Sequence, residues 1–139
     1  MASVLHPLLS AYLLLLLPLV TAQSGAGEIG VGSSIKASRD AKSWVYPSSD
    51  FAFGFQQLEN NEDLFILAIW YYKVQIRTIV WYANGYKPAP TRSKIELIAD
   101  RGLVLSDPRG QLIWRSEIAT GKVTVARMND TCNFEIKKI

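Results

Sequence analysis

The stretch SKIELIADRGLVLSDPRGQLIWRS, residues 93–116, decides the fold class of this chain. Apolar residues recur along it with a period of two, which is the pattern of half-buried strands. These residues are Ile95, Leu97, Leu103, Leu105, Leu112 and Trp114. Residues 100–102 and 107–110 supply turn chemistry, because Asp bonds its own backbone, Pro presets φ and Gly accepts a positive φ. The stretch predicts a β-meander, and we expect any ligand site to lie near its turns or outward faces.

The rest of the chain repeats the same pattern of short runs separated by turn-forming residues. We expect further strands at 33–37, 44–46, 51–55, 64–72, 78–83, 122–128 and 133–136. Sustained helical periodicity is confined to the first residues of the chain. This organisation is typical of an all-β domain.

Residues 51–55 alternate three Phe with small residues, so the three aromatic rings share one face that must be buried. Gly54 within this run indicates close approach of another backbone, or a bulge. Residues 56–63 are polar, and we interpret them as a solvated hairpin loop. Their acidic residues could also be read as a general acid–base pair or a calcium loop, but the spacing of a calcium loop is absent.

The N-terminal 22 residues contain no Lys, Arg, Asp or Glu and include an unbroken Leu run at 13–17. This composition predicts a secretory signal peptide, cleaved between Ala22 and Gln23. The alternative is an uncleaved membrane anchor, although Pro18 closes the apolar run short of the roughly 20 residues that a span needs. Residues 23–139 then form a single extracellular domain.

The formal net charge is +3, and the 15 basic residues are scattered singly apart from the adjacent pair Lys137-Lys138. A nucleic-acid-binding domain usually concentrates basic charge on one face, so we expect no nucleic-acid partner. His6, the only histidine, leaves with the signal peptide, and Cys132 is the only cysteine. We therefore predict no enzyme activity, no cofactor and no metal site. Cys132 either remains a free thiol or forms an intermolecular disulfide.

Three of the four tryptophans, Trp70, Trp81 and Trp114, lie near the ends of apolar runs. Exposed Trp side chains in a groove would point to sugar stacking. Large aromatic side chains also close small β cores. Their position within apolar runs favours the core interpretation.

Five segments together resemble the extracellular bulb-type (mannose-binding, monocot-type) lectin domain of plant G-type lectin S-receptor-like serine/threonine kinases. They read SSDFAFGF (48–55), LAIWY (67–71), RTIVWYANG (77–85), GLVLSDPRGQ (102–111) and MNDTCNF (128–134). The resemblance implies a β-prism, in which three small antiparallel sheets surround a pseudo-threefold axis. It also implies secretion to the apoplast. Because the chain stops at Ile139, without a kinase or transmembrane segment, we expect a C-terminally shortened lectin domain. This shortening leaves two alternatives for the third sheet: it is complete, or it has lost a strand and has an open edge.

The sugar site of this family follows the pattern Gln-x-Asp-x-Asn-x-Val-x-Tyr. A first copy falls on residues 98–106 and keeps Asp100 and Val104, while a second falls on residues 129–137 and keeps Asn133. The resemblance thus implies a degenerate mannose-type site whose carbohydrate-binding residues are Asp100, Val104 and Asn133. Asn129 opens an Asn-Asp-Thr sequon, so it is a predicted N-glycosylation site, and a glycan there would cover the second copy.

The favoured function is a secreted, non-catalytic carbohydrate-binding domain with glycans as partners. One alternative is a sugar-inactive interaction domain that pairs with a receptor-like kinase ectodomain, or with itself, through an open sheet edge. Another is a non-functional fragment of a truncated receptor.

Overall fold

The computed structural model describes residues 27–117, 121–131 and 133–138. The predicted signal peptide, its cleavage point and Cys132 lie outside these residues. Twelve strands form in the described part: β1 Glu28–Gly30, β2 Ser34–Lys36, β3 Trp44–Val45, β4 Phe51–Leu58, β5 Asn61–Tyr71, β6 Ile79–Tyr82, β7 Ala89–Pro90, β8 Lys94–Ile98, β9 Gly102–Ser106, β10 Leu112–Arg115, β11 Val123–Asn129 and β12 Asn133–Lys138.

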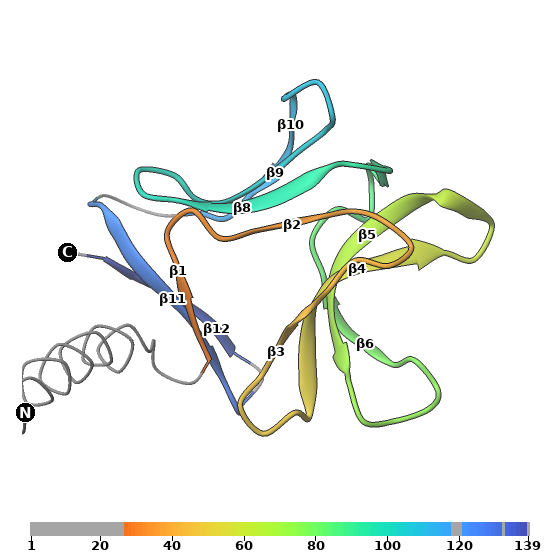
Figure 1. Cartoon of the computed structure of the whole chain (residues 1–139), viewed down its shortest axis with the longest axis horizontal. Helices are drawn as coiled ribbons and strands as arrows, with labels where there is room; N and C mark the ends of the chain where they lie inside the picture. The colour runs from red at the N-terminus through yellow and green to blue at the C-terminus, as the bar shows by residue number, and fades with distance from the viewer. Residues whose placement is uncertain (1–26, 118–120, 132, 139) are drawn as a thin grey trace, which may run out of the picture.

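The strands form three antiparallel sheets that make the three sides of a triangular prism (Figure 1). Their strand orders are β1-β11-β12, β10-β9-β8-β2 and β3-β4-β5-β6, and β7 pairs with β5 in the last of these. The prediction of an all-β prism of three antiparallel sheets is confirmed. The β1-β11-β12 sheet is the smallest, with three strands against four and five in the others.

The core lies along the middle of the prism and draws side chains from all three sheets. Its most deeply buried large members are Tyr46, Phe53, Phe65, Leu67, Ile95, Leu97 and Leu105. The period-two alternation of each strand places these residues on inward faces. The three Phe of residues 51–55 all contact this core, although Phe51 is only partly buried.

The stretch at 93–116 forms the predicted meander, β8-β9-β10. β8 pairs with β9 from Lys94↔Ser106 to Ile98↔Gly102. Between β9 and β10, the Asp107 carboxylate accepts hydrogen bonds of 2.9 Å from the backbone N–H groups of Arg109 and Gln111. The turn chemistry read from the sequence therefore operates in the structure, because Asp107 satisfies the backbone of its own turn.

Two differences from the sequence prediction matter for function. Residues 56–63 are not a loop: β4 runs to Leu58, β5 starts at Asn61, and the two strands meet in a tight turn with Leu58 opposite Asn61. The alternation of residues 51–55 simply continues past the last Phe. The prediction also missed β1, a three-residue strand that pairs with β11. Glu28 of β1 forms a 2.8 Å ion pair with Arg127 of β11, so the two strands are joined across 99 residues of sequence.

Gly54 lies where the predicted close approach occurs. A Cβ atom at this position would lie 3.3 Å from both Cα and Cβ of Ser43, and 3.4 Å from the Trp70 ring. On this outward face Trp70 packs with Ala52 and Ala68 in a small cluster separate from the main core.

Asn84 has a buried side chain that fastens the loop after β6 to β5. Its Oδ1 accepts a 2.7 Å hydrogen bond from the N–H of Leu67. Its Nδ2 donates to the carbonyls of Phe65, at 3.3 Å, and Lys87, at 3.1 Å. All three bonds go to backbone groups, so one buried amide ties the loop to the strand. Within the described residues, no helix has the length and apolar character to cross a membrane.

Candidate functional site

The first predicted sugar-reading segment is the β8–β9 hairpin. Asp100 lies exposed in its turn, and Val104 lies on the outward face of β9. The cross-strand neighbours of Val104 are Glu96 on β8 and Arg115 on β10, and Val104 is only 6% exposed. Long charged side chains commonly cover an apolar neighbour in this way. Val104 therefore offers little surface to the apolar carbons of a sugar ring.

The second segment is the β11–β12 hairpin, where three polar side chains alternate along the turn. The Oδ1 of Asn129 accepts hydrogen bonds of 3.1 Å from both the N–H and the hydroxyl of Thr131. The Nδ2 of Asn133 donates to the same hydroxyl over 3.4 Å. Asn129 and Asn133 stand opposite each other in the ladder. The hairpin thus presents a linked row of amide and hydroxyl groups.

The two segments belong to different sheets, with Asp100 and Val104 in the four-stranded sheet and Asn133 in the three-stranded one. Each hairpin brings its own residues together. The three predicted carbohydrate-binding residues therefore lie at two separate places on the domain.

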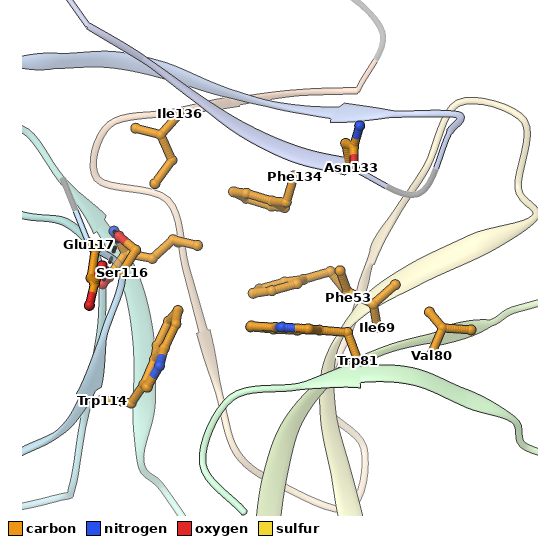
Figure 2. Close-up of a pocket in the computed structure, with 11 residues that line it drawn as sticks. Phe53, Ile69, Val80, Trp81, Trp114, Ser116, Glu117, Asn133, Phe134 and Ile136 are labelled. Carbon is orange, nitrogen blue, oxygen red and sulfur yellow. Dashed lines mark hydrogen bonds between the residues drawn. The ribbon is translucent and has the colours of Figure 1, made fainter.

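An apolar groove of about 440 Å³ opens where the three sheets face one another. It receives Phe53 and Trp81 from one sheet, Leu103 and Trp114 from the second, and Phe134 from the third (Figure 2). The strands that carry Trp81, Trp114 and Phe134 are β6, β10 and β12, and each is an edge strand of its sheet. The groove is therefore framed by three sheet edges.

The three tryptophans predicted as core residues occupy three different environments. Trp70 is 8% exposed, but it packs in the small outward cluster rather than in the middle of the prism. Trp114 is half-buried against the main core. Trp81 is 40% exposed, so the expectation that it is a buried core residue does not hold. It lies on β6, whose four residues are all exposed, because none of the twelve described strands covers that edge.

A second, polar cavity of about 320 Å³ lies beside the five-stranded sheet; we call it the Gln56 cavity. Residues from the 38–43 segment, from β4 and β5, and from the loop after β5 line it. Gln56 is 5% exposed, and its Oε1 is buried without a hydrogen-bond partner. Its polar lining includes Ser38, Arg39, Ser43, Gln56, Gln57 and Arg77.

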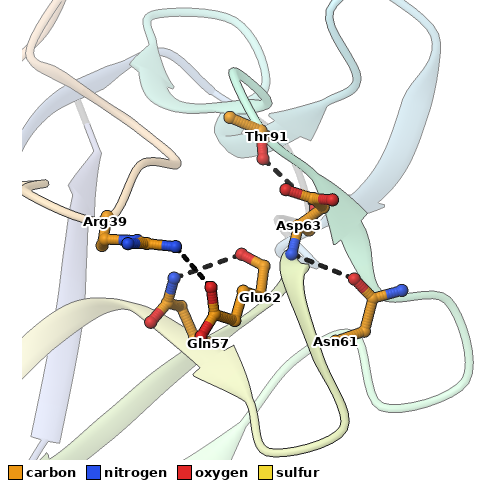
Figure 3. A network of polar contacts seen from close by, with 6 residues as sticks. All are labelled: Arg39, Gln57, Asn61, Glu62, Asp63 and Thr91. Atoms are coloured by element: carbon orange, nitrogen blue, oxygen red, sulfur yellow. Dashed lines mark hydrogen bonds and ion pairs between the residues drawn. The ribbon is translucent and has the colours of Figure 1, made fainter.

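One wall of the Gln56 cavity is held by a network at the β4–β5 hairpin (Figure 3). The guanidinium of Arg39 forms an ion pair with the Glu62 carboxylate. The side-chain amide of Gln57 donates a 3.1 Å hydrogen bond to the Glu62 carbonyl. Beyond it, the side-chain oxygen of Asn61 accepts from the N–H of Asp63 at 3.0 Å. These contacts join the 38–43 segment to the strands beside it.

The described residues contain no group of three or more His, Cys, Asp or Glu side chains placed to hold a metal ion. In the segment 56–63, which the sequence pattern predicts to be a loop, the Glu62 carboxylate pairs with Arg39, and the backbone carbonyl of Asp63 accepts a hydrogen bond from the Thr91 hydroxyl. Asp50, at the start of β4, has a lowered pKa because Lys73 and Ser48 donate hydrogen bonds to its carboxylate and Lys73 adds its positive charge. Asp50 and Lys73 form an exposed ion pair, in which the lysine Nζ lies 3.2 Å from the carboxylate Oδ1.

The curated proteins that match this chain include plant receptor-like kinases, whereas no family model matches. G-type lectin S-receptor-like serine/threonine-protein kinase RLK1 of Arabidopsis thaliana is 44% identical over 115 residues, which cover 78% of this chain and 14% of the relative. LECRK3 of Oryza sativa subsp. indica is 39% identical over 116 residues, 78% of this chain and 14% of that kinase. LECRK2 of Oryza sativa subsp. japonica is 34% identical over 140 residues, 94% of this chain and 17% of that kinase.

The chain belongs with the bulb-lectin domains of the G-type lectin S-receptor-like kinases. It spans roughly one-seventh of the length of these relatives, and the matched region is their lectin part rather than the kinase. The three-sheet prism agrees with this assignment.

Sequence reasoning missed the Gln56 cavity in this lectin domain because it placed Gln56 in a loop. A usable signal was present: Ala52, Gly54 and Gln56 continue the alternation opposite the three Phe, which puts Gln56 on the outward face of β4. The sequence did not show that Arg39 and Arg77 line this cavity, because both lie in irregular segments whose paths depend on tertiary packing.

Proposed function

We propose that this lectin domain acts outside the cell as a non-catalytic carbohydrate-binding module. The lectin assignment of its kinase relatives supports carbohydrate binding in general. The observation that carries the proposal to this chain is the polar row Asn129, Thr131 and Asn133 on the β11–β12 hairpin. Sugar recognition needs donors and acceptors held on a rigid element at neighbouring hydroxyl spacing, and a hairpin provides such a support.

The mannose-type specificity of the proposal rests on the retained polar positions Asp100 and Asn133, because the third retained residue, Val104, is covered. Each site lacks part of its polar set, and each missing hydrogen bond removes about 0.5–1.5 kcal/mol of net binding. Affinity for a single site is therefore weak, and several sites on one surface would raise it through avidity. Secretion rests on the charge-free N-terminal 22 residues, and N-terminal sequencing of the secreted protein should start at Gln23.

A glycan array probed with the full chain tests this function. The chain is produced in one host that adds N-glycans and in one that does not, because a glycan on Asn129 would cover the second hairpin. We expect retention on mannose-type glycans, release by free sugar, and loss of signal in Asn133→Ala or Asp100→Ala. Glu59→Ala, in the exposed β4–β5 turn, is the control that should bind normally. A flat array for both preparations would contradict sugar binding while leaving the fold intact.

A second candidate function is a protein-interaction domain that pairs with a receptor-like kinase ectodomain. It is favoured by a run of exposed large apolar side chains within the described residues. Nine of the eleven such residues fall between positions 71 and 86: Tyr71, Tyr72, Val74, Ile76, Ile79, Val80, Trp81, Tyr82 and Tyr86. Apolar patches beside an unpaired strand edge commonly mark partner surfaces. This candidate predicts co-purification with such an ectodomain and no retention on glycans.

A further inference from the structure

We propose that the Gln56 cavity binds a sugar acid, a pyranose ring that carries hydroxyl groups and one carboxylate. This inference rests on the proposed carbohydrate-binding function and gives it a second site and a ligand class. The cavity lies beside β4 and β5, away from the β8–β9 and β11–β12 hairpins. Its volume of about 320 Å³ is within the range of small-molecule sites.

The buried amide of Gln56 is the first reason to expect a polar ligand. Buried polar atoms in folded proteins nearly always have a hydrogen-bond partner, yet Oε1 of Gln56 has none. No described contact fixes which way the amide faces, so rotation about its last bond can turn either the oxygen or the nitrogen toward the cavity. A ligand hydroxyl can donate to the amide oxygen or accept from the amide nitrogen, whichever faces the cavity. The unpaired amide is therefore suited to a sugar hydroxyl.

The charge of the lining is the second reason and selects an acidic ligand. Arg39 and Arg77 both line the cavity, and the described lining includes no Asp or Glu. The ion pair with Glu62 holds Arg39 in place at one side. Arg77 forms no ion pair with any other described residue, so its guanidinium is available to a carboxylate. Guanidinium groups bind carboxylates through two parallel hydrogen bonds, which fixes the orientation of the ring.

The remaining lining fits the other faces of a pyranose. The hydroxyl groups of Ser38 and Ser43 can both donate and accept, as sugar hydroxyls do. Tyr71 and Tyr72 also line the cavity. The Tyr71 ring packs against Phe51, with ring centroids 5.0 Å apart, whereas Tyr72 is 50% exposed and its ring is free to pack on the apolar side of a sugar. A small inorganic anion could accept from the arginines and from the Gln56 amide nitrogen, but it has no ring to fill a cavity of about 320 Å³. The combined lining therefore favours a ligand with both functions.

Calorimetric titration of the full chain with D-galacturonate, D-galactose and acetate separates these contributions. We expect galacturonate to bind more tightly than either of the others by on the order of tenfold, the effect of one charge-assisted hydrogen bond. Its affinity should fall as salt is raised, because the arginines are partly exposed, whereas galactose binding should not. Acetate binding as tight as galacturonate binding would overturn the proposal.

Three variants locate the site. Arg77→Gln changes an exposed side chain and should leave folding intact while removing the preference for galacturonate over galactose. Gln56→Met keeps the size of the side chain and should weaken both sugars; its fold is checked by circular dichroism. Arg109→Gln, in the exposed β9–β10 turn, removes the same charge elsewhere and should have no effect. An unchanged preference in Arg77→Gln would contradict the proposal.

The same protein preparation is also applied to the mannose array described above. Mannose-type binding that is lost in Asn133→Ala, without galacturonate binding, would reject the Gln56 site alone. Galacturonate binding with a flat mannose array would reject the hairpin sites and retain the Gln56 site. Absence of binding to every sugar would reject both.

Discussion

The indole rings of Trp81 and Trp114 meet edge to face, with ring centroids 5.8 Å apart and an interplanar angle of 69°. The two residues come from edge strands of different sheets, β6 and β10. Their contact therefore joins two sides of the prism at the groove without any backbone pairing. Figure 2 shows the two rings turned toward one another there.

A double-mutant cycle of Trp81→Ala and Trp114→Ala should give a coupling free energy of about 0.5–1.5 kcal/mol, the range for aromatic pairs. Chemical denaturation of the two single variants and the double variant provides the measurement. Trp70 belongs to the separate outward cluster, so Trp70→Ala and Trp114→Ala should be additive. Coupling in the control pair equal to that of the Trp81–Trp114 pair would show that the ring contact is not the cause.

Gly54→Ala should destabilise the domain by about 1–3 kcal/mol, as overpacking does in a well-packed site. The added Cβ meets the backbone of Ser43 at 3.3 Å, and backbone atoms cannot move aside as a flexible side chain can. Gly30→Ala is the matched control, because a Cβ there has no atom within 4 Å. Thermal unfolding midpoints compare the two. Equal effects at positions 54 and 30 would contradict the close approach.

Asn84→Ala should destabilise the domain by about 1–3 kcal/mol, because the buried N–H of Leu67 then lacks its acceptor. Asn84→Asp keeps an acceptor but loses the bonds donated to Phe65 and Lys87. When ionised it also places a negative charge beside two carbonyls, so its pKa should rise on folding and its destabilisation should be larger at pH 7 than at about pH 4. Denaturation curves at the two pH values measure this. If the destabilisation by Asn84→Asp were the same at both pH values, the proposed burial of a carboxylate beside the two carbonyls would be contradicted. Asn61→Asp, at an exposed position, is the control.

Asp50→Asn should remove a small, pH-dependent contribution to stability. The lowered pKa of Asp50 arises mainly from its hydrogen bond with Lys73, then from Ser48 and the charge of Lys73. A carboxyl whose folded pKa lies below its unfolded pKa stabilises the fold above the unfolded value, near 3.8, and this contribution is lost as the pH falls through the folded pKa. The difference between the wild type and Asp50→Asn should therefore be present at neutral pH and vanish in strong acid. High salt should also reduce it, because the pair is exposed.

Val80→Lys combined with Tyr82→Lys should lower the tendency of the domain to self-associate. Both residues lie exposed on β6, which has an unpaired edge, and lysines on an edge strand oppose pairing with another chain. Sedimentation velocity across a concentration series provides the measurement. Leu112→Lys, at an exposed position on the β10 edge, is the comparison. Greater relief from Leu112→Lys than from the β6 pair would move the association surface to β10.

Much of the fold could be read from local chemistry. The meander at 93–116 was predictable because its alternation and its Asp-rich turns act within a few residues of each other. Gly54 was predictable because a glycine among large strand residues needs a close neighbour. β1 was not predictable, because its three residues acquire strand geometry only from a partner at the other end of the domain.

The candidate sites were less accessible to sequence reasoning than the strands. Pattern matching placed Val104 in a sugar site, but it could not show that this side chain is covered by its position between Glu96 and Arg115. Trp81 looked like a core residue because it ends an apolar run, whereas its exposure depends on the absence of a covering strand at β6. Tertiary placement also created the Gln56 cavity, since residues from both flanking loops complete it.

The pairing of β1 with β11 has a consequence for the synthesis of the chain. Glu28 and Arg127 are separated by 99 residues, so at ribosomal rates of 5–20 residues per second β1 waits for about 5–20 s before its partner exists. The other two sheets are built mainly from neighbouring hairpins and can form during that interval. The three-stranded sheet is therefore expected to close last, and closure of the prism becomes a late folding step, before which chaperones can act on an unpaired β1.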